Sequence, residues 1–254
     1  MRVLRLEHSG LPYFATAEDE ATARLLTAAP WLGGTPTDRL VPLARARLLA
    51  PVTPSKIVAV GRNYAEHAAE LGSDLPPEPL LFLKPPSAIV SHETKIEIPS
   101  DSNRVDHEAE IGIVIRSRLR HGDLAAARSA IFGVTCVNDV TARDLQRKDV
   151  QFTRAKGFDT FCPCGPWIET DLDVENLEVI GRVNGTERQR GSTQQMAFPI
   201  LDLVAFMSRV MTLEPGDLIS TGTPSGVGPL APGDVVEVEV SGVGVLRNPV
   251  VAGT

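Results

Sequence analysis

The predicted central strand of this chain reads Asp106-His107-Glu108-Ala109-Glu110-Ile111-Gly112-Ile113-Val114-Ile115. Side chains alternate between the two faces of a strand, so Glu108 and Glu110 share one face while the isoleucines share the other. Two carboxylates at this spacing have Cα atoms roughly 7 Å apart, and they repel each other when they are buried. Either the pair is solvated on an edge strand, or a divalent cation with oxygen ligands lies between the two groups.

Composition indicates a turn-rich globular protein, because 43% of the 254 residues are hydrophobic and 22% are charged, with 20 prolines and 21 glycines. The net charge is −7 and the basic residues are dispersed, which argues against binding to nucleic acid or to an anionic membrane. No apolar run approaches the roughly 18 residues that a membrane span needs. Three cysteines without a Cys-x-x-Cys motif indicate reduced thiols in a cytoplasmic protein.

Two units are expected along the chain. Residues 1–50 form a small N-terminal unit with strands at 2–6 and 11–15 and a helical stretch at 21–27, and prolines 51 and 54 stiffen the linker that follows. Residues 56–254 form the main domain. Its predicted helices are 63–71, 125–130, 141–147 and one starting at Pro199, and its predicted strands include 57–60, 80–83, 131–137, 179–183, 186–190 and 235–240. Many strands with scattered helices indicate a β-rich α+β fold.

Asp139 is the best candidate for a third metal ligand, because it ends a predicted buried strand and can face the same cleft as Glu108 and Glu110. The alternative is that Asp139 caps the helix predicted at 141–147. Gln146 lies seven residues later, two helical turns on, where an amide either orients a substrate oxygen or is merely exposed.

Two further groups could supply acid–base chemistry. Lys156 lies in a mixed loop between two phenylalanines, where it either stabilises a developing enolate or is a solvated charge. His67 and Glu70 are three residues apart on one face of a predicted helix. Glu70 could hold the imidazole as a base toward water, although such pairs are more often simple surface pairs.

The glycine-rich loop from Thr221 to Gly228 matches neither a Walker loop nor a Rossmann motif. Its backbone amides, that of Gly222 included, and the hydroxyl of Thr223 could hold a substrate carboxylate. The alternative is a plain connecting loop. His8, His92, His107 and His121 have no ligand-like spacing, and we expect them to be structural.

In combination, these stretches resemble the fumarylacetoacetate hydrolase family. The matching segments keep the family's order and are residues 60–67, 82–85, 106–115, 137–144, 155–159 and 220–228. The resemblance implies a β-rich roll, commonly a homodimer, preceded by the small N-terminal unit of the bacterial members. It also implies that Mg²⁺ or Mn²⁺ binds to Glu108, Glu110 and Asp139, and that His67 and Glu70 activate water on a mobile lid. The residues implied to contact the substrate are Arg62, Gln146, Lys156, Gly222 and Thr223.

The chain departs from full-length fumarylacetoacetases in two respects. It is much shorter, and Val150 stands where those enzymes have a substrate-binding tyrosine. It is more similar to the small acylpyruvate hydrolases, oxaloacetate decarboxylases and 2-hydroxyhepta-2,4-diene-1,7-dioate isomerases. The resemblance therefore implies a metal-dependent C–C hydrolase or decarboxylase of small 2-oxo acids. The alternatives are a dienoate isomerase of aromatic catabolism and a catalytically silent dimeric binding protein.

Overall fold

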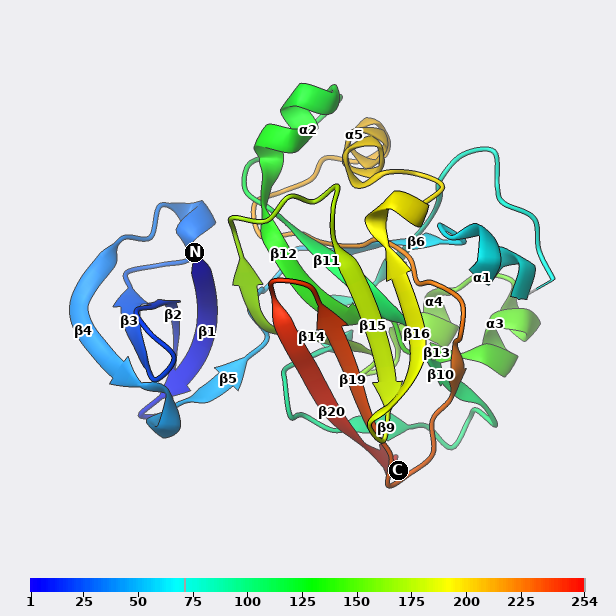
Figure 1. The fold of residues 1–254 in the computed structure, drawn as a ribbon, viewed down its shortest axis with the longest axis horizontal. Coiled ribbons are helices and arrows are strands. Elements are labelled where there is room, and N and C mark those ends of the chain that lie inside the picture. Colours follow the sequence, from blue (N-terminus) through cyan, green and yellow to red (C-terminus); the bar gives the residue numbers. More distant parts are fainter. Residues whose placement is uncertain (71, 254) are drawn as a thin grey trace.

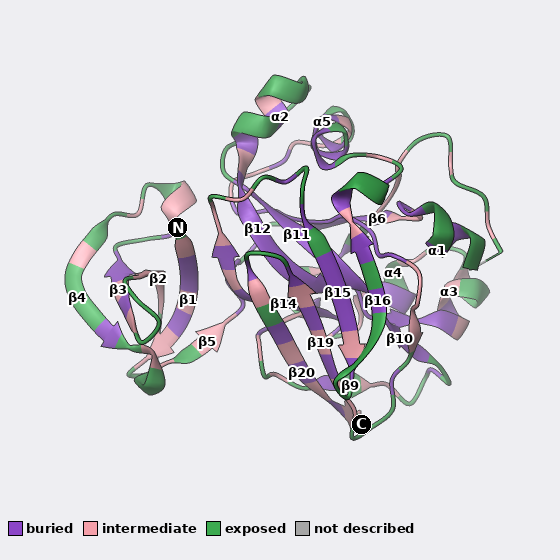
Figure 2. Ribbon diagram, viewed as in Figure 1, coloured by how far each residue is buried: buried purple, intermediate pink, exposed green. Residues whose placement is uncertain are grey.

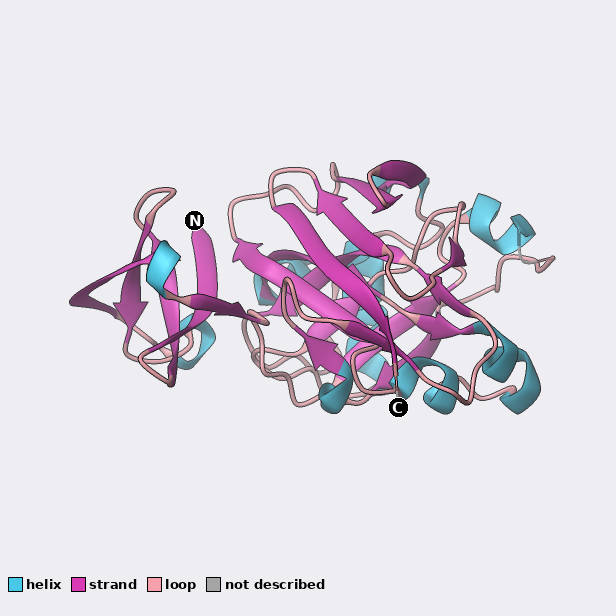
Figure 3. Ribbon diagram, turned by 90° about the horizontal axis from the view of Figure 1, so that it is seen from below, coloured by secondary structure: helices cyan, strands magenta, loops and turns pink. Residues whose placement is uncertain are grey.

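The structure is a computed structural model that describes residues 1–70 and 72–253. A small β-unit and a larger strand-rich body lie side by side and are joined by strand pairing (Figure 1). Several short helices lie along the lower edge of the strand-rich body in the view of Figure 3. Within the described residues, no helix has both the length and the apolar character needed to cross a lipid bilayer.

The N-terminal unit is a small curved sheet around its own apolar cluster. Its elements are β1 (Arg2–His8), β2 (Leu11–Ala17), β3 (Thr22–Leu26), η1 (Pro30–Leu32), β4 (Pro36–Pro42), η2 (Leu43–Arg45) and β5 (Arg47–Leu49). The buried cluster contains Leu4, Leu6, Ala15, Ala23, Leu25 and Val41. Strand β1 also pairs with β14 of the larger body, with Val3 opposite Ile168. The two units therefore share one continuous sheet.

That shared sheet has the order β4-β3-β2-β1-β14-β12-β11-β17-β6-β7, with β5 on β1 and β8 on β14. Its strands in the larger body are β6 (Ile57–Gly61), β7 (Leu80–Lys84), β8 (Ile89–Val90), β11 (Ala109–Ile115), β12 (Ile131–Asn138), β14 (Cys162–Glu169) and β17 (Leu218–Ser220). Strand β11 lies between β12 and β17, which explains why all seven of its residues are buried (Figure 2).

A second sheet packs against the first and has the order β16-β15-β19-β20-β9. Its strands are β9 (Ile96–Ile98), β15 (Glu178–Val183), β16 (Thr186–Ser192), β19 (Val235–Val240) and β20 (Gly244–Ala252). The main core lies between the two sheets, where Ile111 and Ile113 of β11 belong to the same buried cluster as Val179 and Val238. The face of β11 that carries its isoleucines therefore builds the core, as the alternation predicted.

A short third sheet, β13-β10-β18, and several small helices surround the end of β11. The strands are β10 (Val105–His107), β13 (Thr141–Ala142) and β18 (Gly228–Pro229). The helices are α1 (Ala65–Glu70), α2 (Leu124–Ala130), α3 (Arg143–Asp149), α4 (Thr153–Gly157) and α5 (Ile200–Val210), with turns η3 (Pro86–Ala88) and η4 (Thr193–Gln195). Helices α1, α3 and α4 lie at the same end of the body (Figure 1).

Several sequence predictions need correction. Residues 21–27 are not helical, because β3 pairs there with both β2 and β4 and buries Ala23 and Leu25 in the small cluster. The helix predicted at 141–147 begins at Arg143, since the two residues before it form β13. Lys156 lies on the short helix α4 and not in a loop. The helix predicted at 63–71 is α1, and its predicted last residue, Leu71, lies outside the described residues.

Candidate active site

Three buried carboxylates meet where β11 begins and β12 ends. The pairing of Ala109 with Asn138 makes Glu108 and Asp139 neighbours, and the Asp139 amide donates a hydrogen bond to the Glu108 carbonyl oxygen at 2.9 Å. Glu110 lies on β11, two residues after Glu108. Each of the three residues offers one oxygen atom, and these oxygens lie within 4.8 Å of one another. The predicted convergence of the three residues is therefore found in the structure.

Asp139 is not a helix cap, because the residue that precedes α3 is Ala142, which makes no side-chain capping bond. The argument that linked Asp139 to Gln146 through two helical turns was therefore wrong. Gln146 nevertheless lines the same cavity, where its side-chain oxygen accepts a hydrogen bond from Arg143 Nη1 at 2.8 Å.

Three buried cations hold the carboxylates. Lys156 Nζ donates to Glu108 Oε2 at 2.8 Å and to Asp139 Oδ2 at 2.5 Å. Arg143 Nη2 donates to Glu108 Oε1 at 2.6 Å, and Lys84 Nζ donates to Asp139 Oδ1 at 2.6 Å. Lys156 is thus a buried partner of the acidic cluster, which rules out the alternative of a solvated loop charge.

Glu110 has no such cation partner among residues 1–70 and 72–253. Burial raises its pKa to about 8, and the charges of Asp139 and Glu108 add to the effect. Burial also tends to raise the pKa of Glu108, but the charges of Lys156 and Arg143 outweigh burial and lower that pKa. For Lys156, the neighbouring carboxylates outweigh burial and raise the pKa, so the ammonium stays protonated.

The glycine-rich loop serves the cluster itself. The Gly222 amide donates to Glu110 Oε2 at 2.9 Å, and so does the Ser220 hydroxyl at 2.5 Å. The Thr223 hydroxyl donates to the Ala109 carbonyl at 2.9 Å and is therefore not free to donate to a ligand in this arrangement. Both donors are used within the protein in this arrangement, and Thr223 also lines the cavity, so contact of these two groups with a substrate stays a prediction.

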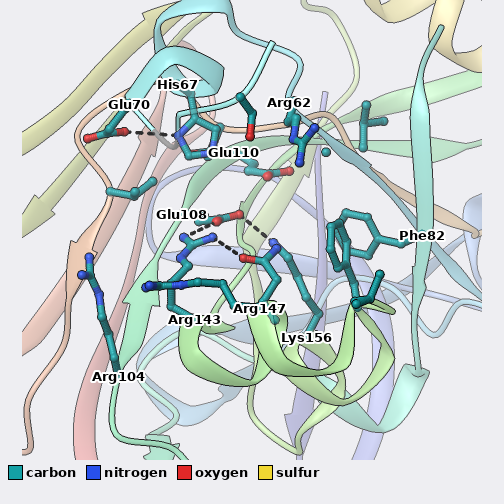
Figure 4. Close-up of a pocket in the computed structure, with 18 residues that line it drawn as sticks. Arg62, His67, Glu70, Phe82, Arg104, Glu108, Glu110, Arg143, Arg147 and Lys156 are labelled. Atoms are coloured by element: carbon teal, nitrogen blue, oxygen red, sulfur yellow. Dashed lines mark hydrogen bonds and ion pairs between the residues drawn. The ribbon is translucent and has the colours of Figure 1, made fainter. Parts of the chain in front are cut away.

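A cavity of about 580 Å³ opens above the cluster. His67 and Glu70 of α1 lie on its upper side in Figure 4, with His67 Nδ1 3.3 Å from Glu70 Oε2. His67 is only 4% exposed whereas Glu70 is exposed, so the pair joins a buried imidazole beside the cavity to a carboxylate at the surface. Arg62 also lines the cavity, and its positive φ of 59° is uncommon for a residue other than glycine.

The donor set fits a hard divalent cation such as Mg²⁺ or Mn²⁺. Carboxylate oxygens are the ligands that these ions prefer. Glu110 is the group whose ionised form is least stabilised by the protein alone, and a nearby cation would supply the missing charge. The residues that would hold such an ion are Glu108, Glu110 and Asp139.

Four functional neighbours were not predicted from the sequence. Lys84 and Arg143 hold the carboxylates, Asp106 accepts from Arg143 Nε at 3.0 Å, and Gln189 donates to the Thr223 hydroxyl at 2.7 Å. Lys84 at the end of an apolar strand was the available signal, because an unpaired lysine is rarely found fully buried.

The chain thus combines a β-rich body with an acidic cluster beside a cavity. Comparison with known proteins shows which family of enzymes has this domain. Residues 56–251 match the model of the fumarylacetoacetate (FAA) hydrolase C-terminal family, and residues 1–51 match that of the Rv2993c-like N-terminal family. The chain belongs to the fumarylacetoacetate hydrolase family.

Named relatives include enzymes of more than one kind. The chain is 47% identical over 198 residues to the mitochondrial oxaloacetate decarboxylase of Dictyostelium discoideum, covering 75% of this chain and 91% of that one. It is 41% identical to the human mitochondrial oxaloacetate tautomerase FAHD2A, covering 84% of this chain and 72% of that one. The crystal structure of a 5-carboxymethyl-2-hydroxymuconate delta-isomerase from Mycobacterium smegmatis matches with a TM-score of 0.94 and 45% identity over the full length of both chains.

Proposed function

We propose that this chain is a divalent-metal-dependent enzyme that decarboxylates small 2-oxo diacids of the oxaloacetate type. The observation that carries the proposal is the charge balance of the buried cluster and its hydrogen-bonded neighbours. Its four carboxylates and four cations cancel when all are ionised: Asp106, Glu108, Glu110 and Asp139 against Lys84, Arg104, Arg143 and Lys156. A bound divalent ion adds two positive charges, which a dianionic substrate would neutralise.

A divalent ion held by the three carboxylates would act as a Lewis acid toward the oxygens of a 2-oxo acid. Lys156 supplies the chain's own contribution, because its buried ammonium can donate a hydrogen bond to a developing enolate oxygen. Loss of carbon dioxide leaves the electron pair of the broken C–C bond on that enolate, which then takes up a proton. The Phe82 ring also lines the cavity, and its centroid lies 4.9 Å from Lys156 Nζ, within cation–π distance.

Tautomerisation would use the same groups. Interconversion of the keto and enol forms of oxaloacetate also passes through an enolate, so Lys156 would stabilise it in the same way. The names of the Dictyostelium and human relatives support this pair of activities on one substrate. The reaction for which the mycobacterial isomerase is named likewise moves a proton within a conjugated acid, which keeps dienoate isomerisation as an alternative.

Hydrolysis of an acylpyruvate is a second candidate, and the His67–Glu70 pair favours it. If His67 Nδ1 donates to Glu70, Nε2 carries the lone pair and can take a proton from water. Attack of that water on the distal carbonyl would release a carboxylic acid and the pyruvate enolate. Decarboxylation needs no attacking water, so His67 separates the two reactions.

A panel assay tests these proposals. Oxaloacetate, acetylpyruvate and a dienoate are each incubated with the protein and Mg²⁺ or Mn²⁺, and the products are identified by mass. Reactions without protein are the control, because free metal ions also decarboxylate oxaloacetate. We expect Glu108→Ala to abolish protein-dependent turnover. We expect His67→Ala to lower hydrolysis by about 100-fold or more, the usual contribution of a general base, and to spare decarboxylation. Equal turnover with and without a chelator would contradict the metal dependence.

Two expectations stay predictions: the homodimer, which the family resemblance implies, and the cytoplasmic location, which the cysteine pattern indicates. Light scattering on a size-exclusion column tests the expected homodimer, and fractionation of the native cells tests the expected cytoplasmic location.

A further inference from the structure

The helix α1 that carries His67 and Glu70 touches the loop from Thr221 to Gly228 at two points. The Gly226 amide donates to both carboxylate oxygens of Glu70, at 3.1 and 3.2 Å. The Ser225 hydroxyl donates to Glu66 Oε2 at 3.2 Å. Two acidic side chains of one helix therefore accept hydrogen bonds from two adjacent residues of one turn.

Helix α1 has little stability of its own. It is six residues long, well below the length at which a helix is stable in water without tertiary contacts. Glu66 and Glu70 are four residues apart, so their like charges destabilise the helix further. The donors at Ser225 and Gly226 satisfy both carboxylates at once, and they oppose this repulsion.

Contacts with the second sheet hold the turn at Ser225 and Gly226 in place. Gln189 of β16 is buried and donates through Nε2 to the Thr223 hydroxyl at 2.7 Å and to the Pro224 carbonyl at 2.8 Å. Gly226 lies directly against this strand, because an added Cβ would be 2.0 Å from the Arg188 carbonyl oxygen. The Gly226 amide is therefore held in place by contacts that do not involve α1.

We propose that the Ser225–Gly226 turn is a latch that holds α1 over the cavity and orients Glu70 toward His67. Ser225 and Gly226 are positioning residues, since neither lines the cavity and both act through the carboxylates of α1. With Glu70 held by the Gly226 amide, its Oε2 atom remains within 3.3 Å of His67 Nδ1. The catalytic consequence rests on the proposed function of His67, whereas the holding of α1 does not.

Amide hydrogen exchange of the α1 peptide tests the latch without any substrate. Ser225→Ala removes one donor at an exposed site, and Gly226→Ala displaces the turn from Arg188. We expect both variants to exchange faster in α1 than the wild type, Ser225→Ala by about 2- to 10-fold, as expected for one hydrogen bond. The matched control is Ser129→Ala, which should leave α1 exchange unchanged, because among the described residues its hydroxyl donates to the Ala125 carbonyl of its own helix α2. Unchanged exchange in both turn variants would overturn the proposal.

Kinetics then test the positioning of His67. We expect Ser225→Ala to lower kcat for acetylpyruvate hydrolysis by about 2- to 10-fold, to change KM less, and to shift the pH profile of hydrolysis. Oxaloacetate decarboxylation should be unaffected. Faster α1 exchange with unchanged hydrolysis and an unchanged pH profile would refute the positioning of His67. If no substrate of the panel is turned over, the proposed function fails, and the exchange data alone decide whether the latch exists.

Discussion

Metal binding should release a proton from Glu110, and the structure gives the size of the effect. In the metal-free protein, burial and the charges of Asp139 and Glu108 raise the pKa of Glu110 to about 8. A metal ligand must be ionised, so each binding event expels whatever proton Glu110 carries. From this pKa we expect about 0.9 proton released per Mg²⁺ at pH 7 and about 0.1 at pH 9.

The same proton weakens metal binding in acid. Competition between the proton and the metal at a group with this pKa makes the apparent Kd about 100-fold weaker at pH 6 than at its alkaline limit, and about 10-fold weaker at pH 7.

In the absence of metal, a rise in pH acts on stability in the opposite direction. Because folding raises the pKa of Glu110 above its ordinary value of 4.5, the contribution of this residue to the stability of the metal-free protein falls as pH rises from about 4.5 to 8.

Titration calorimetry measures both the number of protons released and the apparent Kd for Mg²⁺. Mg²⁺ is added between pH 6 and pH 9 in pairs of buffers with different ionisation enthalpies, and the difference in heat gives the number of protons released. Glu110→Gln should release none, and His67→Asn, which removes another titratable group of the cavity, should release as many as the wild type. Less than about 0.2 proton at pH 7, together with an affinity that does not change between pH 6 and pH 8, would refute the reasoning.

Two further predictions concern stability. Lys84→Met leaves Asp139 without one of its two buried cations, and we expect urea denaturation to show a loss of about 3 kcal/mol or more in the free energy of unfolding. Lys56→Met is the control, because it removes a more exposed amine from Asp217 and should lower the free energy of unfolding less. Equal losses in the two variants would contradict the importance of burial. Trp31 of the N-terminal unit packs edge to face on Phe132 of β12, with 5.3 Å between ring centroids, and we expect Trp31→Ala to lower the free energy of unfolding by about 3 kcal/mol. A thermal transition unchanged from wild type would show that this contact does not hold the two units together.

Local patterns in the sequence predicted the strand framework well. Alternation identified the core face of β11, although the strand predicted at 106–115 is interrupted at Glu108, which separates β10 from β11. The strands predicted at 179–183 and 186–190 form the hairpin of β15 and β16. The segment 21–27 was wrong because its alanines and leucines suit a helix, while its strand character depends on pairing with β2 and β4 on either side. Such pairing is not visible in a short window of sequence.

The candidate site was only partly predictable for the same reason. Glu110 on β11 and Glu108 just before it could be identified because alternation along this segment places them side by side. Lys84 reaches Asp139 across 55 positions of sequence, and Gln189 lies in a strand segment that otherwise reads as polar and exposed. Their roles follow from contacts between distant segments, which residue spacing alone does not reveal.

The pairing of β1 with β14 has a practical consequence for protein engineering. If residues 1–50 were deleted to obtain a minimal enzyme, the backbone of β14 at Ile168 and Glu169 would lose its partner strand. Unpaired strand edges recruit strands from other molecules, so the truncated protein would be prone to aggregation even with the candidate active site intact. A minimal version would need a charged or proline substitution along that exposed edge to remain monodisperse.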